Sequence, residues 1–402
     1  MNPIVAFVVV MAVWTVAEYV SRMTKGLLSS LLVASVIFVI GFMSGLFPDD
    51  MLRASSLLAL AGVVVGFIIV HLGTMISLDD FKKQWRTFLI GIAAVAGIAV
   101  LLFFAFAIFG SDARTDAYDN LVSNGRDYMI AGIGALSGGT ISVLIVQDAA
   151  LGLGLTTVAA FPVLIVAIQG LIGFPLTSIL LRREASRLKG EYREGRIEVP
   201  PEPDESAPSP TLLPKALLNT PGTLFIVGIV VLLALGVNNI TNGVLNTFVV
   251  ALIFGIVLRT TRVFKPMVLA GIDSFGLMML AILILVFGPL TTLELSDLKA
   301  LAGPLVVVFV FGVIGIVGFS ALVGKLLGYS IPMAVSIGLT SLYGFPGTMV
   351  LSQEAARAAG ETEDEVKAIE GVILPKMIIA GFSTVTITSV VVIGILASRI
   401  GT

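Results

Sequence analysis

Long apolar segments separated by short polar turns fill most of the chain. They fall at residues 3–20, 27–47, 55–77, 87–109, 128–147, 151–181, 220–238, 244–258, 267–290, 302–324, 331–353 and 369–397. An α-helix rises about 1.5 Å per residue, so about 20 apolar residues cross a hydrocarbon core of about 30 Å. The segments are continuously apolar and do not alternate, which argues against a β-barrel. The pattern predicts an all-α polytopic membrane protein.

Composition supports this class and excludes several functions. Of 402 residues, 57% are hydrophobic and only 12% are charged, whereas soluble domains average about 25% charged residues. We expect a multi-pass protein of the cell inner membrane or plasma membrane, with its first apolar segment retained as a helix. The chain has no cysteine and one histidine, His71, so we expect no disulfide, no cofactor and no protein-held metal. It carries no nucleotide-binding loop motif, and we expect neither enzymatic activity nor a nucleic-acid partner.

One hydrophilic stretch divides the chain into two halves. Residues 182–216 are first charged and then rich in Pro, Ser and acids, a composition typical of a flexible connector. We predict a cytoplasmic linker there, between an N-terminal membrane repeat at 1–181 and a C-terminal membrane repeat at 217–402. The halves share the order of their segments and similar polar turns, such as "HLGTMISLDDFKKQW" and "GPLTTLELSDLKALAG". This ordered similarity predicts an internal repeat.

Each half contains one apolar segment with a glycine-rich interruption. Segment 128–147 contains "SGGT", and segment 331–353 contains "GFPGT". If both segments dip into the membrane and return, each repeat keeps about five transmembrane helices. The two repeats are then inverted, and more Lys and Arg residues fall on the cytoplasmic side. Inverted repeats with discontinuous helices are typical of secondary transporters. Broken helices that cross the membrane remain the alternative to this re-entrant arrangement.

The interruptions are suited to binding a small anion. Each arm reaches only part of the hydrocarbon core, so the turn would lie near its middle, where glycine lets a ligand approach the backbone. The free N–H groups and positive dipole end of the second arm attract negative charge. The predicted substrate-binding residues are Ser137, Gly138, Gly139, Thr140, Ser142, Gly344, Phe345, Pro346, Gly347 and Thr348.

Other polar residues in apolar surroundings are candidates for coupling. Intramembrane charges are costly and often functional, which draws attention to Asp148, Glu354 and Lys376. The alternative is that the two acids are plain helix-end charges and that the lysine extends outward to the polar interface. We expect His71 to be a hydrogen-bonded interface residue rather than a proton relay. The remaining polar groups that would serve a cation are Thr74, Thr291 and Gln169.

The segment order, the central linker and the "SGGT" and "GFPGT" motifs resemble the glutamate:sodium symporter family of bacterial transporters. More loosely, they resemble the wider group of inverted-repeat elevator transporters, which includes citrate and bile-acid sodium symporters. The resemblance covers nearly the whole chain in layout but only two short motifs in residues. It implies a sodium-coupled carrier of a small carboxylate or an amino acid such as glutamate. It also implies a homodimer in which a scaffold stays still while a transport domain slides.

The sequence thus leads to one principal hypothesis and two alternatives. The principal hypothesis is a secondary active transporter of a small organic anion, coupled to Na⁺, that works by an elevator movement in the lipid bilayer. One alternative is a cation/proton antiporter that uses Asp148 and Glu354. The other is a carboxylate carrier coupled to H⁺.

Overall fold

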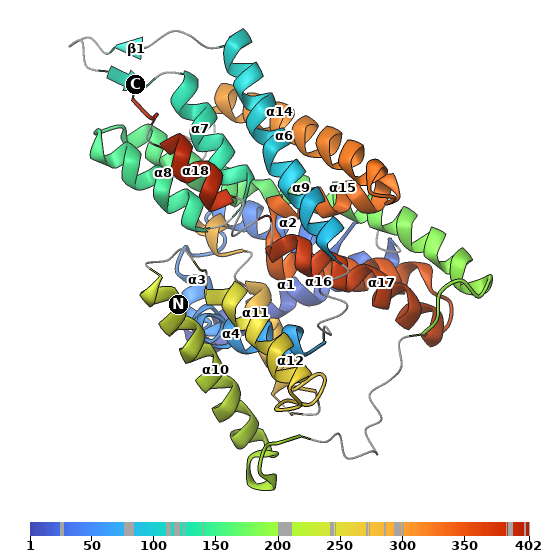
Figure 1. Ribbon diagram of the computed structural model, residues 1–402. Helices are drawn as coiled ribbons and strands as arrows, with labels where there is room; N and C mark the ends of the chain where they lie inside the picture. The colour runs from blue at the N-terminus through green and yellow to red at the C-terminus, as the bar shows by residue number, and fades with distance from the viewer. Residues whose placement is uncertain are drawn as a thin grey trace. The chain divides into compact units, whose positions relative to one another are not determined.

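The computed structural model is helical apart from one short β-ladder (Figure 1). It describes residues 1–24, 28–75, 84–109, 114–115, 121–123, 125–138, 140–199, 211–241, 245, 247–270, 272, 274–284, 287–292, 299, 301–382, 384, 389–397 and 399–401. The chain forms two compact units. The first comprises 1–8, 50–85 and 200–288, and the second comprises 9–49, 86–199 and 289–402. Each unit therefore draws on both sequence halves, so the units do not coincide with the predicted repeats.

The first unit is built on α4 and α11. Its elements are α3 (Met51–Ala54), α4 (Leu57–Met75), η1 (Lys215–Leu217), α10 (Thr220–Ile240), α11 (Thr247–Thr260) and α12 (Phe275–Leu283). Gly73 of α4 and Gly255 of α11 meet backbone to backbone, because a Cβ at either position would collide with a carbonyl oxygen of the other helix. Small residues at such crossings let membrane helices pack closely.

The second unit contains both interrupted segments. Its elements are α1 (Pro3–Met23, from Val9 on), α2 (Ser30–Met43), α6 (Trp85–Phe109, from Arg86 on), β1 (Arg114–Thr115), β2 (Leu121–Ser123), α7 (Gly125–Leu136), α8 (Thr140–Gly152), α9 (Thr156–Arg193), α14 (Ala302–Leu326), α15 (Ile331–Leu339), η4 (Thr340–Leu342), α16 (Gly344–Ala359), α17 (Glu363–Phe382) and α18 (Ser389–Ala397). The 3-10 helix η3 (Gly288–Thr292) begins with the last residue of the first unit and continues in the second unit along the chain. Figure 1 shows α18 beside α7 and α8, on which it packs.

The expectation of apolar spans is confirmed for six of the described helices. By length and composition α1, α4, α6, α9, α10 and α14 can cross a membrane. The expected segment at 369–397 contains α17, which ends at Phe382, and α18, which begins at Ser389, and most residues between them lie outside the described part of the chain. Among the described residues of the expected segment at 267–290 are the short helix α12 and the start of η3. Its first residues form a loop that is bound by α4, as described below.

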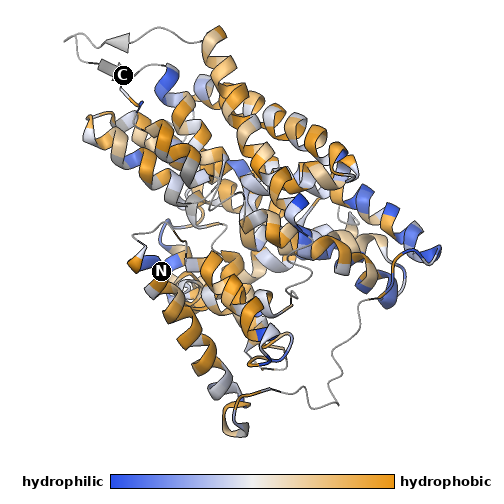
Figure 2. Ribbon diagram, viewed as in Figure 1, coloured by the Kyte–Doolittle hydropathy of each residue, from blue (hydrophilic) through white to orange (hydrophobic). Residues whose placement is uncertain are grey.

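The predicted linker begins later than residue 182, because α9 continues as a helix to Arg193. The residues that make this stretch hydrophilic also stabilise the helix. Arg187 pairs with Glu184 three positions before it and with Glu191 four positions after it, and such spacings bring side chains together on a helix. In Figure 2 the hydrophilic residues gather at this end of α9 and at the adjoining start of α17. Residues 200–210 of the predicted linker lie outside the described residues.

Candidate functional site

The first interruption lies where the sequence predicts it. Helix α7 ends at Leu136 and α8 begins at Thr140. Gly138 has φ +84°, a left-handed conformation that glycine adopts readily. A Cβ at Gly134 would lie 2.9 Å from a methyl group of Val146. This contact requires α8 to fold back along α7, since a continuous helix would separate these residues by about 18 Å.

The polar residues of the first interruption have different environments. The Ser137 hydroxyl donates to the carbonyl oxygen of Gly134 at 3.2 Å. Ser142, in the first turn of α8, is buried, and its hydroxyl has no hydrogen-bond partner among the described residues. Gly139 and the side chains of Thr140 and Asp148 lie outside the described part of the chain. The N-terminus of α8 therefore presents one orphaned buried hydroxyl next to its free backbone N–H groups.

The second interruption is longer than the predicted motif. Helix α15 ends at Leu339, and η4 leads to Gly344, whose φ is +56°. Phe345 is extended, and its peptide bond to Pro346 is cis. Thr348, in the first turn after the break, is fully buried, and its Oγ1 has no partner among the described residues. An orphaned hydroxyl thus stands at the N-terminal end of the second arm in both interrupted segments.

Both interruptions lie against α14. A Cβ at Gly312 would collide with Leu136, the last residue of α7. A Cβ at Gly338, near the end of α15, would collide with Ser320 and lie 3.1 Å from Ile316. Positions 312, 316 and 320 are four apart and share one face of α14, and the outer two are separated by about 12 Å along the axis. The first arms of the two segments therefore end on the same face of one helix.

The second interruption also lies on α9. A Cβ at Gly173 would lie 2.9 Å from the Tyr343 ring and 3.0 Å from Leu342. The Tyr343 hydroxyl donates to Thr177 Oγ1 at 2.9 Å. Gln169 lies one turn before Gly173 on the same face of α9, and its buried Oε1 has no partner among the described residues. Sequence reasoning missed Tyr343 and Thr177, because neither belongs to a glycine-rich motif.

The packing of α7 on α9 shows which part of α9 lies beside the first interruption. Near the start of α7, the ring of Tyr128 lies 5.0 Å from that of Phe161 in α9. Helix α8 folds back on α7, and α9 follows after a short turn and packs on α8. Helices α7 and α9 therefore run in the same direction. Tyr128 and Phe161 are at the same level, and Leu136 and Gln169 lie equally far beyond them along their helices. The first interruption therefore begins at about the level of Gln169. The predicted coupling residue Gln169 thus lies near both interruptions.

Two of the three charged candidates, Glu354 and Lys376, have described side chains, and each has a contact of its own. Glu354, further along α16, accepts hydrogen bonds from Ser21 Oγ at 3.1 Å and from the backbone N–H of Ser30 at 3.0 Å. Its carboxylate therefore stabilises the N-terminus of α2. Lys376 Nζ lies 5.4 Å from the centre of the Tyr329 ring, a cation–π arrangement. Among the described residues, Glu354 and Lys376 form no ion pair with each other.

His71 and Thr74 bind the loop that precedes α12 in the first unit. His71 Nδ1 accepts from the N–H of Leu269 at 3.0 Å, and Thr74 Oγ1 accepts from the N–H of Val268 at 3.0 Å. His71 is therefore the hydrogen-bonded interface residue that the sequence favours. The Thr74 hydroxyl is engaged in holding this loop. Thr291 lies in η3, in the part of that helix that belongs to the second unit.

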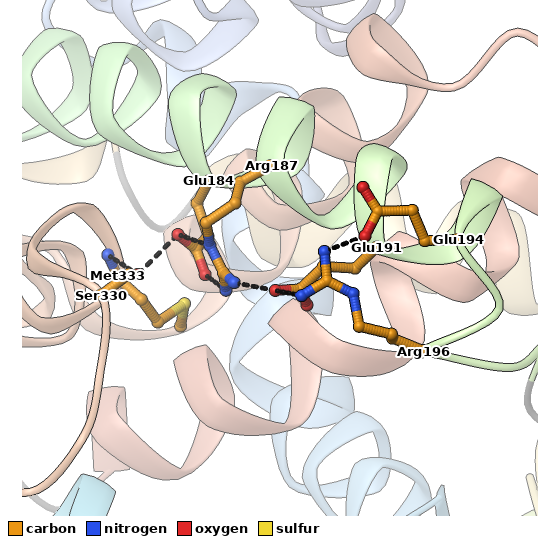
Figure 3. Close-up of polar contacts among 7 residues, drawn as sticks. All are labelled: Glu184, Arg187, Glu191, Glu194, Arg196, Ser330 and Met333. Carbon is orange, nitrogen blue, oxygen red and sulfur yellow. Dashed lines mark hydrogen bonds and ion pairs between the residues drawn. The ribbon is translucent and has the colours of Figure 1, made fainter.

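The polar end of α9 holds the base of the second interrupted segment. Buried Glu184 accepts from the Ser330 hydroxyl at 2.5 Å, and Ser330 in turn caps α15 by accepting from the N–H of Met333 at 3.2 Å. Figure 3 shows this chain continuing through Arg187 and Glu191 along the helix. An interaction at the end of α9 thereby fixes where α15 begins.

A second set of ion pairs joins α9 to the corner between α16 and α17, and we expect it to weaken in acid. Lys189 and Arg193 bind Glu361 at 2.6 and 2.8 Å, and Arg193 also binds Glu365 at 2.7 Å. The hydrogen bond from Lys189 lowers the pKa of Glu361, and the one from Arg193 lowers that of Glu365, below the ordinary 4.5. Carboxylates with depressed pKa values stabilise the fold fully above about pH 4.5, and this contribution is lost as the pH falls through the folded-state pKa.

Amide hydrogen exchange in residues 186–193 measures this acid sensitivity. Protection, corrected for the intrinsic exchange rate, should be lower at about pH 3.5 than at about pH 7. The double variant Glu361→Gln, Glu365→Gln should lose protection already at neutral pH. Glu194→Gln is the matched control, since the ion pair that the structure gives Glu194 is with Arg196, two residues further along the chain. Equal protection of the wild-type protein at both pH values would contradict the interpretation.

Comparisons with known proteins identify no family for the chain. No protein-family model matches it, and no curated protein matches it significantly. The functional conclusion therefore rests on the interrupted segments themselves. Their common features are a helix N-terminus, an orphaned buried hydroxyl and a position on α9 and α14.

Proposed function

We propose that the protein is a secondary active transporter of a small organic anion, coupled to Na⁺. One observation carries the proposal: both interrupted segments end on the same face of α14, and both pack on α9. The N-terminal ends of α8 and α16 then serve one ligand. Free N–H groups and the helix dipole stabilise a carboxylate without a positively charged side chain.

The orphaned polar atoms identify the groups that bind the anion. A buried hydroxyl without a partner costs about 1–3 kcal/mol, so such groups need an explanation in a folded protein. Ser142 and Thr348 each hold one such hydroxyl in the first turn after a break. In the proposal both hydroxyls donate to the carboxylate, and Gln169 orients the rest of the substrate.

The division into two units supports alternating access by an elevator movement. Both interrupted segments belong to one unit, while α4, α10 and α11 belong to the other. We propose that the unit with the interruptions moves with the substrate and that the other serves as the scaffold of a homodimer. A neutral complex of anion and cation lowers the penalty for moving charge through the bilayer.

The antiporter alternative has weaker support. It requires two exchanging carboxylates, and the one that the structure describes, Glu354, is bound to the N-terminus of α2. A carrier coupled to H⁺ would use the second oxygen of Glu354, which has no hydrogen-bond partner among the described residues. The antiporter predicts a response to a cation or to pH without any anion, and the carrier coupled to H⁺ predicts a carboxylate response that depends on pH in place of Na⁺.

Ligand-dependent stability tests the proposal. The purified protein in detergent is heated with a panel of small carboxylates and amino acids, with and without Na⁺. A ligand that binds only the folded state adds about 2.7 kcal/mol at a hundredfold excess over its Kd. We expect one carboxylate to raise the melting temperature and to need Na⁺ to do so. A protein that responds to cations or pH but to no anion would overturn the proposal in favour of the antiporter.

A further inference from the structure

Two arginines near the end of α9 differ from the other basic residues there. Most basic side chains between residues 182 and 196 form an ion pair with a glutamate, namely Arg187, Lys189, Arg193 and Arg196. Arg182 and Arg183 form no ion pair in the described part of the chain, and Arg183 is exposed. Both directly follow the apolar run "FPLTSILL", so they lie where the membrane-crossing part of the helix ends.

The end of α14 repeats this pattern on a second helix. Lys325 lies in the last turn, is exposed and forms no ion pair with any residue that the structure describes. Leu322 and Leu326 beside it are 61% and 78% exposed. On α9, the exposed Ile179 precedes Arg183 by one turn on the same face. On both helices an exposed apolar surface thus ends at a basic side chain without a carboxylate partner.

The start of α15 joins these two helix ends. Helix α14 ends at Leu326 and α15 begins at Ile331, so the chain turns sharply between them. Ser330, in this turn, binds Glu184 of α9, the residue after Arg183 (Figure 3). Lys325 and Arg183 are therefore each within a few residues of one contact. The exposed apolar side chain of Ile331 follows that contact directly.

The helices that form this end of the unit supply almost no negative charge. Helices α6, α14 and α15 contain no Asp or Glu, and α9 contains none before Glu184. Glu184 is buried and already bound by Arg187 and Ser330. Arg86, at the start of α6, adds positive charge, since its guanidinium donates to the carbonyl oxygen of Leu327 at 3.3 Å. The surface around Arg183 and Lys325 is therefore positively charged.

We propose that this surface binds an anionic phospholipid, with phosphatidylglycerol as the simplest example. The positive charge requires an anion, and the exposed apolar side chains favour an anion that carries acyl chains. Arg183 and Lys325 bind the phosphate group, and an acyl chain lies along Leu322 and Ile331. Arginine is suited to this role because its guanidinium donates two parallel hydrogen bonds to a phosphate. Each basic residue near an anionic membrane surface raises the affinity about fivefold.

A lipid bound there would tie the end of α14 to the end of α9. Both ends hold the start of α15, so the lipid would stabilise the base of the second interrupted segment. This inference goes beyond the proposed function, because it requires neither an organic anion nor Na⁺. Lipid binding and transport can therefore be tested, and can fail, independently.

The melting temperature of the delipidated full chain in detergent tests this surface. Phosphatidylglycerol is added stepwise in mixed micelles, and phosphatidylcholine with the same acyl chains forms a parallel series. We expect the wild-type protein to be stabilised at lower mole fractions of phosphatidylglycerol than of phosphatidylcholine. The double variant Arg183→Gln, Lys325→Gln should raise the phosphatidylglycerol midpoint about 25-fold, or about fivefold for each charge removed. Arg183→Lys keeps the charge and should remain within about threefold of wild type.

Arg196→Gln is the matched control, because it removes the same charge further along the chain, where Arg196 is paired with Glu194. Its midpoint should equal that of the wild-type protein. If the double variant fails to fold, the single variants Arg183→Gln and Lys325→Gln provide the same comparison. Equal responses to the two lipids overturn the inference, as does an unchanged midpoint in a folded variant or an equal shift in Arg196→Gln. Stabilisation by inorganic phosphate as strong as that by phosphatidylglycerol would overturn it in favour of a soluble anion.

Discussion

Replacing Gly347 by valine should lower uptake of the organic anion by more than about a hundredfold. A Cβ at this position would lie 2.8 Å from the Tyr343 ring and 3.3 Å from the Phe174 ring, and valine adds two methyl groups to it. The turn before α16 must shift, because the rings pack on each other and Tyr343 is bound to Thr177. Loss of one or two hydrogen bonds to a carboxylate, each worth about 1.5–3 kcal/mol, gives the expected effect.

Uptake into proteoliposomes, with the substrate that the stability panel identifies, measures this loss. Gly303→Val is the matched control, because a Cβ at Gly303 in α14 meets no atom within 4 Å. Gly347→Ala should have an intermediate effect. The melting temperature of each variant shows whether the unit remains folded. Wild-type uptake by a folded Gly347→Val protein would exclude the second interruption from the substrate site.

The two interruptions could be predicted from the sequence because they violate the pattern around them. Glycine and proline inside an apolar helix remove hydrogen bonds or side-chain packing, so "SGGT" and "GFPGT" indicate breaks. The structure ends α7 and begins α8 at these residues. The second break begins at Thr340, four residues before the motif. Nothing marks this early start in the sequence, since Thr340 and Ser341 are tolerated in membrane helices.

The other differences between the predicted and the observed helices depend on contacts between residues far apart in the chain. Helix α17 ends with the apolar run "PKMIIAGF", and Thr384 beyond it meets Thr340. Such a contact has no local signal. The extension of α9 could not be predicted for another reason: its charged residues are equally typical of a solvated linker. The ion pairs of Arg193 with Glu361 and Glu365 decide between these interpretations, and they join residues far apart in the chain.

Substitution of Gly97 or Gly315 by valine should destabilise the second unit by about 3 kcal/mol or more. The two glycines lie near the middle of α6 and α14. A Cβ at either residue would collide with the carbonyl oxygen of the other. The partner atoms belong to helix backbones, which cannot rotate away as a side chain can. Gly318→Val on α14 is the control, since nothing lies within 4 Å of its Cβ position.

Thermal unfolding in detergent, read by size-exclusion chromatography after heating, measures this effect. The contact is reciprocal, with each glycine against the carbonyl oxygen of the other. Either single substitution already separates the helices. The double variant should therefore lose much less stability than the sum of the losses in the two single variants. Similar losses in the two single variants, with this non-additivity, would confirm that the two glycines form one shared contact. A wild-type melting temperature for Gly97→Val would show that the helices do not cross there.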